Sequence, residues 1–337
     1  MQVSARIDIL HLAKTFTISG SSKDDEPVVV VQLECDGLVG VGEGAPVDYW
    51  GETPESMLAF LASPEVSKAL GDDPFALEDI GDRLAELPGN TGAKMALDGA
   101  LHDWIGKRLG QPVWRLLGLP PTTPPTSFTI GIDSVGGTIE RTREAEGFEV
   151  LKIKVGGPDD LARLQAVRAN TDARLRIDGN EGWTLDTARE LMPVLLDLGV
   201  EFVEQPFPAG DIEPYLRLRD LPRRIPVVID EGCKDSRQVA EIATYADGVN
   251  LKLAKTGGIR EAVRAVHVAR AHGLSVMFGC MIESQLGIAQ AAQIASLADY
   301  IDLDGHLLIS NSPFTGLGFA NGRVVVSEEP GLGVQQL

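Results

Sequence analysis

The chain has 337 residues, of which 44% are hydrophobic and 23% are charged, as in ordinary globular proteins. Its formal net charge of −19 argues against a nucleic-acid partner and against an anionic membrane surface, because both are bound through an excess of Lys and Arg. Cys35, Cys233 and Cys280 form no disulfide or zinc pattern, and no run of apolar residues approaches membrane-spanning length. The opening residues MQVSARIDIL lack the apolar core of a signal segment, so we expect a reduced, cytoplasmic protein.

The first 120 residues are typical of a small α+β domain. Residues 28–46 predict two antiparallel strands joined at Asp36-Gly37, because this residue pair between apolar segments favours a tight hairpin turn. Helical stretches follow, the last of them at residues 92–110. The proline-rich segment at 120–126 then indicates a linker.

From residue 127 onward, short apolar runs rich in β-branched residues alternate with amphipathic helical stretches. Strands that alternate with helices indicate parallel βαβ units, and eight evenly spaced units favour a closed barrel over an open, doubly wound sheet. The active site of such a barrel lies at the C-terminal ends of its strands. The expected fold is therefore α/β, of the TIM-barrel type. The eight runs cover residues 127–132, 150–155, 175–180, 202–206, 226–230, 248–253, 275–281 and 300–305.

These patterns give the expected domain organisation. Residues 1–120 form an N-terminal α+β domain, and residues 121–309 form the barrel. The tail, residues 310–337, is rich in Gly and Ser and is expected to pack back on the N-terminal domain and complete it.

Three acidic residues lie at the ends of consecutive predicted strands. Asp178, Glu204 and Asp230 follow one another at intervals of 26 residues, which places their carboxylates side by side on one rim of the barrel. Three unpaired anions would repel one another, so we expect a shared cation. Oxygen ligands favour a hard ion, with Mg²⁺ as the first choice and Mn²⁺ as the second. The alternative is that each residue caps a helix or pairs with a basic side chain.

Lysines inside apolar strands are the second unusual feature. Lys152 and Lys154 are two residues apart in one strand and so face the same side, the barrel interior. Lys252 lies four strands further on, opposite Lys154. Two neighbouring ammonium groups and a metal ion would lower the pKa of a lysine, which would make it a usable base. Lys255 falls after the strand and is expected to extend to solvent.

With these motifs in place, the sequence resembles the enolase superfamily, specifically the muconate-lactonizing-enzyme subgroup. The resemblance implies a (β/α)7β barrel with an α+β N-terminal capping domain. It also implies that Asp178, Glu204 and Asp230 bind Mg²⁺, while Lys154 and Lys252 are the acid and base. Such a site removes a proton α to a carboxylate and stabilises the resulting enediolate. The matching motifs are KIK (152–154), DGN (178–180), EQP (204–206), DE (230–231) and LKLAKTGG (251–258).

The last predicted strands resemble those of dipeptide epimerases such as the L-Ala-D/L-Glu epimerases. Asp302 and Asp304 share one face of their strand and form an anionic pocket suited to the α-ammonium of a dipeptide. A solvated acidic turn is the alternative. The resemblance further implies that Lys152 contacts the substrate carboxylate, and that Thr129 and Cys280 lie near the dipeptide.

The expected reaction is a 1,1-proton transfer, because two opposed lysines without a leaving group invert one carbon, the Cα of the C-terminal residue. Side-chain preference stays open: epimerases acting on L-Ala-D/L-Glu tend to carry an arginine in the loop between the first two strands, whereas the segment at 17–27 here offers only Lys23. Residues 48–53 add Tyr49 and Trp50 as an apolar lid or as domain-interface core.

Two alternatives remain. One is a lyase or cycloisomerase of the same fold, such as an o-succinylbenzoate synthase or a muconate cycloisomerase. The other is a non-catalytic barrel that binds a metal or ligand. The expected partner is a small-molecule substrate, with neither nucleic acid nor membrane, and the question of a homo-oligomer stays open.

Overall fold

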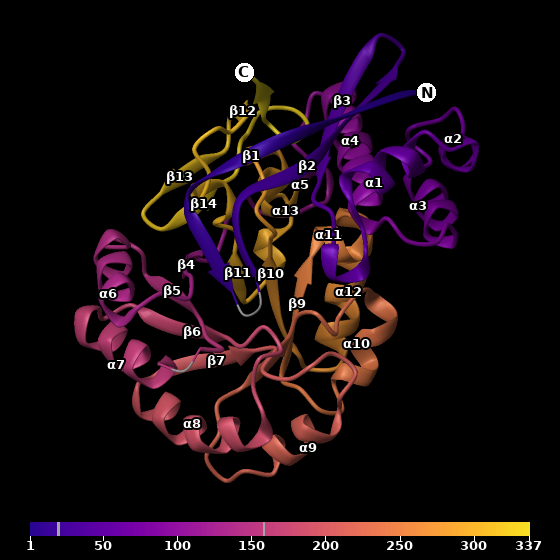
Figure 1. Cartoon of the computed structure of the whole chain (residues 1–337). Coiled ribbons are helices and arrows are strands. Elements are labelled where there is room, and N and C mark those ends of the chain that lie inside the picture. Colours follow the sequence, from indigo (N-terminus) through magenta and orange to yellow (C-terminus); the bar gives the residue numbers. More distant parts are fainter. Residues whose placement is uncertain (19–20, 158) are drawn as a thin grey trace.

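A computed structural model of the chain describes residues 1–18, 21–157 and 159–337, and it has two layers (Figure 1). The upper layer is the α+β capping domain, built on an antiparallel sheet in the order β1-β2-β3. The predicted hairpin is confirmed: Cys35 pairs with Leu38 across a turn in which Asp36 and Gly37 both have positive φ. The elements of this layer are β1 (Gln2–Ile18), β2 (Ser21–Cys35), β3 (Leu38–Gly44), α1 (Pro54–Leu61), α2 (Pro64–Leu70), α3 (Leu77–Glu86), α4 (Thr91–Leu109) and α5 (Val113–Leu116).

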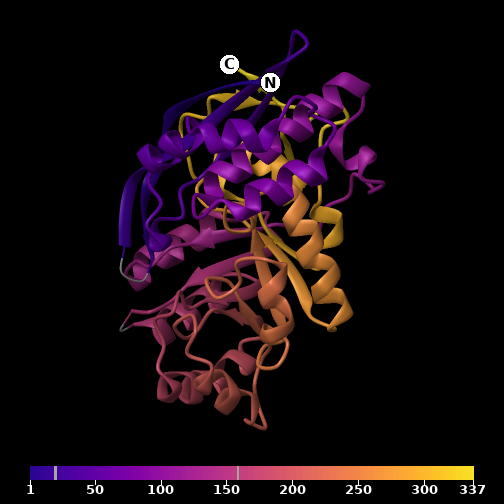
Figure 2. The same cartoon turned by 90° about the vertical axis from the view of Figure 1, so that its right-hand side faces the viewer.

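The segment at 17–27, which we expected to be a loop, is largely strand. Ile18 pairs with Ser21, and residues 21–27 belong to β2. Pairing with β1 satisfies the backbone groups of this polar segment, and this outweighs its low strand propensity. Ser19 and Gly20 lie outside the described residues. The hairpin reaches the barrel, where the carbonyl of Thr17 accepts a hydrogen bond from Ile132 N at 2.9 Å (Figure 2).

The lower layer is an eight-stranded parallel sheet in the order β11-β10-β9-β8-β7-β6-β5-β4. A parallel bridge between Thr126 and Ile301 joins its two edges and closes the barrel. Each of the eight predicted runs overlaps one of the strands, although β6 and β7 begin one and two residues before their runs, so the (β/α)7β prediction is confirmed. The strands are β4 (Ser127–Ile130), β5 (Val150–Lys154), β6 (Arg174–Asp178), β7 (Val200–Glu204), β8 (Val227–Ile229), β9 (Gly248–Lys252), β10 (Ser275–Gly279) and β11 (Tyr300–Asp302).

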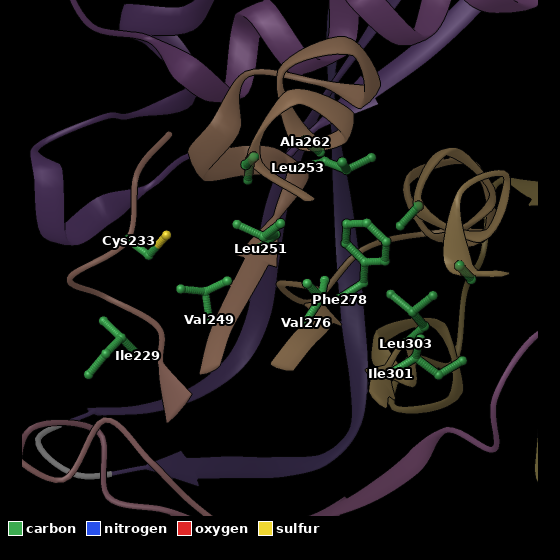
Figure 3. Close-up of a cluster of buried hydrophobic side chains, with 14 of the residues drawn as sticks. Ile229, Cys233, Val249, Leu251, Leu253, Ala262, Val276, Phe278, Ile301 and Leu303 are labelled. Carbon is green, nitrogen blue, oxygen red and sulfur yellow. The ribbon is translucent and has the colours of Figure 1, made fainter. Parts of the chain in front are cut away.

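Helices surround this barrel, and the alternation of side chains along each strand separates its two faces. On β9, Val249 and Leu251 point outward into the apolar layer beneath α12, where Figure 3 shows them in one cluster with Ala262. Asn250 and Lys252 therefore point into the barrel. The surrounding helices are α6 (Val135–Glu144), α7 (Asp160–Asn170), α8 (Leu185–Asp197), α9 (Glu213–Arg219), α10 (Ser236–Ile242), α11 (Leu253–Thr256), α12 (Ile259–Ala271) and α13 (Gln285–Ala292).

Hydrogen bonds join the two layers at a helix terminus and through the tail. The carboxylate of Asp98 on α4 accepts from Ile259 N, the first residue of α12, at 2.7 Å. After β11, the carbonyl of Gly331 in the tail accepts from Val113 N at 3.0 Å. Among the helices of the described residues, none combines the length and apolar character needed to cross a membrane. The mouth of the barrel thus lies beneath the capping domain, and the site is built there.

Candidate active site

Strand register aligns the functional residues in one layer at the barrel mouth. Lys154, Asp178 and Glu204 are the last residues of β5, β6 and β7, and they are direct neighbours in the parallel ladder. Asp230 follows the last residue of β8. All three carboxylates are fully buried. The equal sequence spacing therefore becomes proximity in space, as expected from the sequence.

Lysine ammonium groups lie among these carboxylates. Nζ of Lys152 lies 2.9 Å from Asp178 and 2.8 Å from Glu204. No three acidic, histidine or cysteine side chains of the described residues converge on a single point suited to a metal ion. Because buried anions repel each other, the nearest cation balances them, and here that cation is Lys152.

Lys154 and Lys252 occupy opposite sides of the mouth. In the closed sheet, β5 and β9 are four strands apart in either direction. Nζ of Lys154 donates to Asp178 at 2.7 Å and to Asn180 at 2.9 Å. Nζ of Lys252 lies 2.7 Å from the Asp230 carboxylate. Each lysine is thus oriented by its own carboxylate, and the two face a common space.

The expectation that Lys255 extends to solvent is wrong. Instead, this residue is only 1% exposed, and its Nζ donates to Asp230 Oδ1 at 2.5 Å and to the carbonyl of Asn250 at 2.9 Å. The chain turns from β9 directly into the short helix α11, which carries Lys255 inward. Gly257 and Gly258, both with positive φ, form the turn that follows.

Three polar residues that sequence reasoning missed hold the carboxylates in place. Asn250 donates to Glu204 at 2.7 Å, and the Gln205 side chain accepts from Asp230 N at 2.9 Å. Asn180 and Gln205 have positive φ, an uncommon backbone state for residues other than glycine that often marks functional sites. For Asn250 the sequence did hold a signal of a functional role. It is a polar residue at an inward-facing position of an apolar strand, two residues before Lys252.

The acidic pair of the last strand lies beside Lys152. Oδ2 of Asp302 accepts from Lys152 at 2.8 Å, while its Oδ1 is buried without a hydrogen-bond donor. Oδ2 of Asp304 accepts from the backbone N–H of Thr129 at 2.7 Å. Burial and the Asp302 charge together raise the pKa of Asp304 to about 7. The pair is therefore a buried acidic pocket, and the alternative of a solvated turn is wrong.

Cys280 follows β10 at the edge of this pocket, next to Gly305. Burial raises the pKa of its thiol well above the ordinary value, as do the charges of Glu283 and Asp304. The thiol is therefore neutral near pH 7 and is not poised for nucleophilic chemistry. Cys280 thus offers a small, neutral surface beside the acidic pair.

Two of the lysines have raised pKa values in the protein without a metal. Burial lowers the pKa of Lys152, but the charges of Asp178 and Asp302 outweigh burial, so this pKa lies well above its ordinary value. Burial also lowers the pKa of Lys252, but the Asp230 charge outweighs burial, and this pKa too lies well above its ordinary value. The expectation of a lowered lysine pKa concerned a site that holds a metal ion, and for that site it stays a prediction.

The carboxylates of Asp178, Glu204 and Asp230 have the chemistry of a divalent-cation site, although in the described part of the chain they do not converge on one metal position. Burial and the Asp178 charge together raise the pKa of Glu204 to about 8. Oε2 of Glu204 lies 2.8 Å from Nζ of Lys152, and Oδ2 of Asp230 lies 2.7 Å from Nζ of Lys252. Buried carboxylate oxygens are the ligands that a hard cation prefers.

The lid residues lie above Lys252. The rings of Tyr49 and Trp50 meet edge to face, with centroids 5.3 Å apart, and Tyr49 is 44% exposed, so it is not interface core. Burial raises the pKa of the Tyr49 hydroxyl, and the Asp230 charge raises it further, which places this hydroxyl near the site. Lys23 is already paired, at 3.0 Å with Glu26 and at 2.9 Å with Asp48.

Comparison with known proteins identifies two family segments. Residues 3–118 match the mandelate racemase / muconate lactonizing enzyme N-terminal domain, and residues 135–336 match the enolase C-terminal domain-like family. Together they cover the capping domain and the barrel.

Individual relatives align over nearly the whole chain. The L-Ala-D/L-Glu epimerase of Bacteroides thetaiotaomicron is 37% identical, over 97% of this chain and 86% of that protein. A hydrophobic dipeptide epimerase of Flavobacteria bacterium (strain MS024-2A) is 38% identical, over 90% of this chain and 89% of that protein. The structure of a dipeptide epimerase from Methylococcus capsulatus, complexed with Mg and L-Arg-D-Lys, is similar with a TM-score of 0.91 and 33% identity, over 99% of this chain and 98% of that one.

Proposed function

This chain belongs to the mandelate racemase / muconate lactonizing enzyme family of the enolase superfamily, and on that premise we propose that it is a Mg²⁺-dependent dipeptide epimerase. It is an isomerase that inverts the Cα of the C-terminal residue. The observation that carries the proposal is the opposed pair Lys154 and Lys252, together with the buried acidic pair Asp302 and Asp304.

Asp178, Glu204 and Asp230 would hold the Mg²⁺ ion, with Mn²⁺ as the alternative. When bound, the divalent cation supplies positive charge that stabilises negative charge developing on a substrate carboxylate. Asn250, Gln205 and Lys255 keep these ligands in position through the hydrogen bonds described above. Such supporting contacts commonly determine how strongly a site binds its metal.

Lys154 and Lys252 carry the proton transfer. One amine removes the Cα proton, and the ammonium on the other side returns a proton to the opposite face. The resulting carbanion is spread over the substrate carboxylate as an enediolate. Lys152, whose Nζ lies between the ligand carboxylates and Asp302, faces the position of that carboxylate. Since no bond to a leaving group is broken, inversion at one carbon is the outcome.

Asp302 and Asp304 bind the α-ammonium of the dipeptide. The free Oδ1 of Asp302 is positioned to accept a hydrogen bond, and an incoming ammonium favours ionisation of Asp304. Thr129 acts through Asp304, since its backbone N–H holds that carboxylate. Cys280 contributes the neutral wall of the pocket. A muconate or succinylbenzoate carries no ammonium and would be repelled, which argues against the lyase alternative.

The lid disfavours an acidic C-terminal side chain. Lys23, the lid cation that could pair with such a side chain, is already bonded to Glu26 and Asp48. Asp24 and Asp25 add further negative charge to the same hairpin. We therefore assign an apolar or cationic residue to that position. The relatives differ here, since their names include L-Glu, hydrophobic dipeptides and L-Arg-D-Lys.

The domain bounds belong to the same proposal: a capping domain of residues 1–120 completed by the tail at 310–337, and a barrel of residues 121–309. Backbone contacts between Val113 and Gly331 support the attachment of the tail. A cytoplasmic location is supported by Cys35, Cys233 and Cys280, which are all free thiols.

A dipeptide library in deuterated water tests the proposed function. The protein is incubated with Mg²⁺ and each dipeptide, and mass spectrometry measures deuterium at the C-terminal Cα. Incorporation with apolar or cationic C-terminal residues, together with formation of the epimer, is the expected result. The absence of exchange with every dipeptide would exclude the activity. Incorporation only with N-acylated amino acids would instead identify a different racemase of this fold.

A further inference from the structure

A second cavity lies between the capping domain and the barrel, away from the catalytic lysines. Its volume is about 690 Å³, within the usual range for small-molecule sites. Its walls come from α3 and α4 above and from α10, α11 and α12 below, a region on the right-hand side of Figure 1. Lys154, Lys252 and Asp302 do not line it. It is therefore a different cavity from the barrel mouth, although Trp50 of the lid and Lys255, which holds Asp230, also line it.

Basic side chains outnumber acidic ones in the lining of this cavity, although three of their acidic partners, Glu78, Asp82 and Asp230, lie outside the lining. Six basic and four acidic side chains line the cavity, although the formal net charge of the chain is −19. Four of the six basic groups already have acidic partners: Lys255 contacts Asp230, Arg237 contacts Asp235, and Arg260 and Arg264 contact Glu78 and Asp82. Among the described residues, no carboxylate lies within 4 Å of the other two, Lys94 and Lys234.

Each of these two lysines contacts a neutral group. Lys94 is half-buried, and its Nζ donates to the carbonyl of Leu87 at 2.5 Å. Burial lowers its pKa, the charge of Glu52 opposes this lowering, and the Arg237 charge adds to it, so an incoming anion would favour the charged form. Nζ of Lys234 lies over the Trp50 ring, 4.3 Å from its centroid. A neutral aromatic face leaves its donors free for an anion.

Another part of the lining is apolar. Ile80 and Leu84 on α3 and Leu101 on α4 are buried side chains that line the cavity, and Leu77 joins them. A ligand that satisfies both parts of the lining has an anionic group and an apolar body. We propose that this cavity binds a small organic anion, whose carboxylate or phosphate group lies between Lys94 and Lys234 and whose apolar body packs against α3.

Such a ligand would bridge the two layers next to the catalytic machinery. Lys234 belongs to the segment that follows Asp230 and Glu231, and Lys255, which also lines the cavity, holds Asp230. Lys94 belongs to α4 of the capping domain. An anion shared by Lys94 and Lys234 would therefore tie the cap to the loop that carries a ligand carboxylate. Binding should raise the thermal stability of the whole protein, because it acts only on the folded state.

Isothermal titration with naphthalene-2-carboxylate tests the site, with the neutral naphthalene-2-methanol as the matched probe. The expected result is saturable binding of the carboxylate and at least tenfold weaker binding of the alcohol, since charge-assisted hydrogen bonds are lost. Lys94→Met and Lys234→Met should each weaken carboxylate binding about tenfold. Lys68→Met, on the exposed face of α2, is the matched control and should leave it unchanged.

The measurement is repeated on the Lys154→Ala protein and with saturating dipeptide and Mg²⁺, so that it does not depend on catalysis. Unchanged binding of the carboxylate is expected in both cases. Displacement of the probe by the dipeptide, equal binding of the alcohol, unaltered affinity in both cavity variants, or no binding at all would each overturn the proposal. Lys234 is exposed, so the Lys234→Met protein should fold even if Lys94→Met does not.

Discussion

Buried carboxylates occur in two regions of this molecule, and their surroundings differ. At the barrel mouth, Asp178 and Asp230 each lie within 2.7 Å of a lysine ammonium. Where β3 of the cap meets the segment before α13, Glu43 and Glu283 converge above Gly287. No basic nitrogen of the described residues comes within 4 Å of either glutamate. Both regions are buried, and among the described residues only the first has basic side chains within 4 Å of its carboxylates.

Buried carboxyl groups with two lysines beside them therefore differ in pKa from those without a basic neighbour. Burial raises the pKa of Asp178, but Lys152 and Lys154 outweigh it and hold the value at about 2. Burial raises the pKa of Glu43 to about 7 and that of Glu283 to about 8. The ionised Asp178 and Asp230 at the mouth are suited to bind a cation, whereas the glutamates at the domain contact are suited to hydrogen bonding as neutral acids.

Removal of one carboxylate charge at the barrel mouth should have the largest effect on metal binding and turnover. Asp178→Asn keeps the shape of the side chain but loses a ligand charge, so Mg²⁺ affinity should fall at least about 100-fold and turnover about 1000-fold. Titration calorimetry with Mg²⁺ measures the first quantity without reference to catalysis. Asp186→Asn, on the exposed side of α8, is the control and should bind Mg²⁺ normally. Unchanged Mg²⁺ affinity in Asp178→Asn would show that this rim does not bind the metal.

A substitution in the acidic pocket that binds the ammonium should have a smaller effect on turnover. Asp304→Asn removes one charged acceptor, so kcat/KM for a free dipeptide should fall about 100-fold. An N-acetylated dipeptide has no ammonium, and its already low kcat/KM should change little between the two proteins. Kinetic assays with the substrate pair measure this difference. Equal losses for both substrates would mean that Asp304 acts on the fold and not on the ammonium.

Substitution of one of the neutral glutamates should have the smallest effect, and this effect is on stability. Because folding raises the pKa of Glu43 from 4.5 to about 7, its stabilising contribution is complete below pH 4.5 and is lost as the pH rises through about 7. That loss is on the order of 3 kcal/mol, or roughly 5 °C in Tm. Glu43→Gln mimics the neutral acid and should reduce the fall in Tm between pH 5 and pH 8.5.

Thermal unfolding at the two pH values provides this measurement. Glu34→Gln, at an exposed position of β2, is the matched control and should show the same fall in Tm as the unaltered protein. An equal fall in the Glu43→Gln protein would contradict a neutral Glu43 in the folded state at low pH.

The barrel was predictable because its signals are periodic. Apolar runs at regular intervals gave all eight strands, and parallel register then aligned the ends of those strands, including Lys154 and Asp178. The hairpin at Asp36 and Gly37 was predictable because its turn depends on local residue chemistry. Local and periodic patterns therefore sufficed for the framework of the site.

The rest depends on tertiary contacts that no local pattern records. The inward path of Lys255 depends on where α11 begins, and the strand at 21–27 depends on pairing with β1 rather than on its polar composition. The raised lysine pKa values depend on the number of buried carboxylates around each ammonium. Neither the interface cavity nor the Glu43 and Glu283 contact has a sequence signature, because each joins segments distant in the chain.

The most direct test of the two-lysine account follows hydrogen exchange at Cα in deuterated water, with each epimer of an accepted dipeptide as a separate substrate. The unaltered protein should exchange and invert both epimers. Lys154→Ala and Lys252→Ala should each lose epimerisation about 1000-fold, since a general base or acid contributes 10²–10⁴-fold. Each should still exchange the Cα hydrogen of one epimer, and the two variants should retain opposite epimers. Loss of exchange for both epimers in one variant, with full epimerisation in the other, would contradict the account.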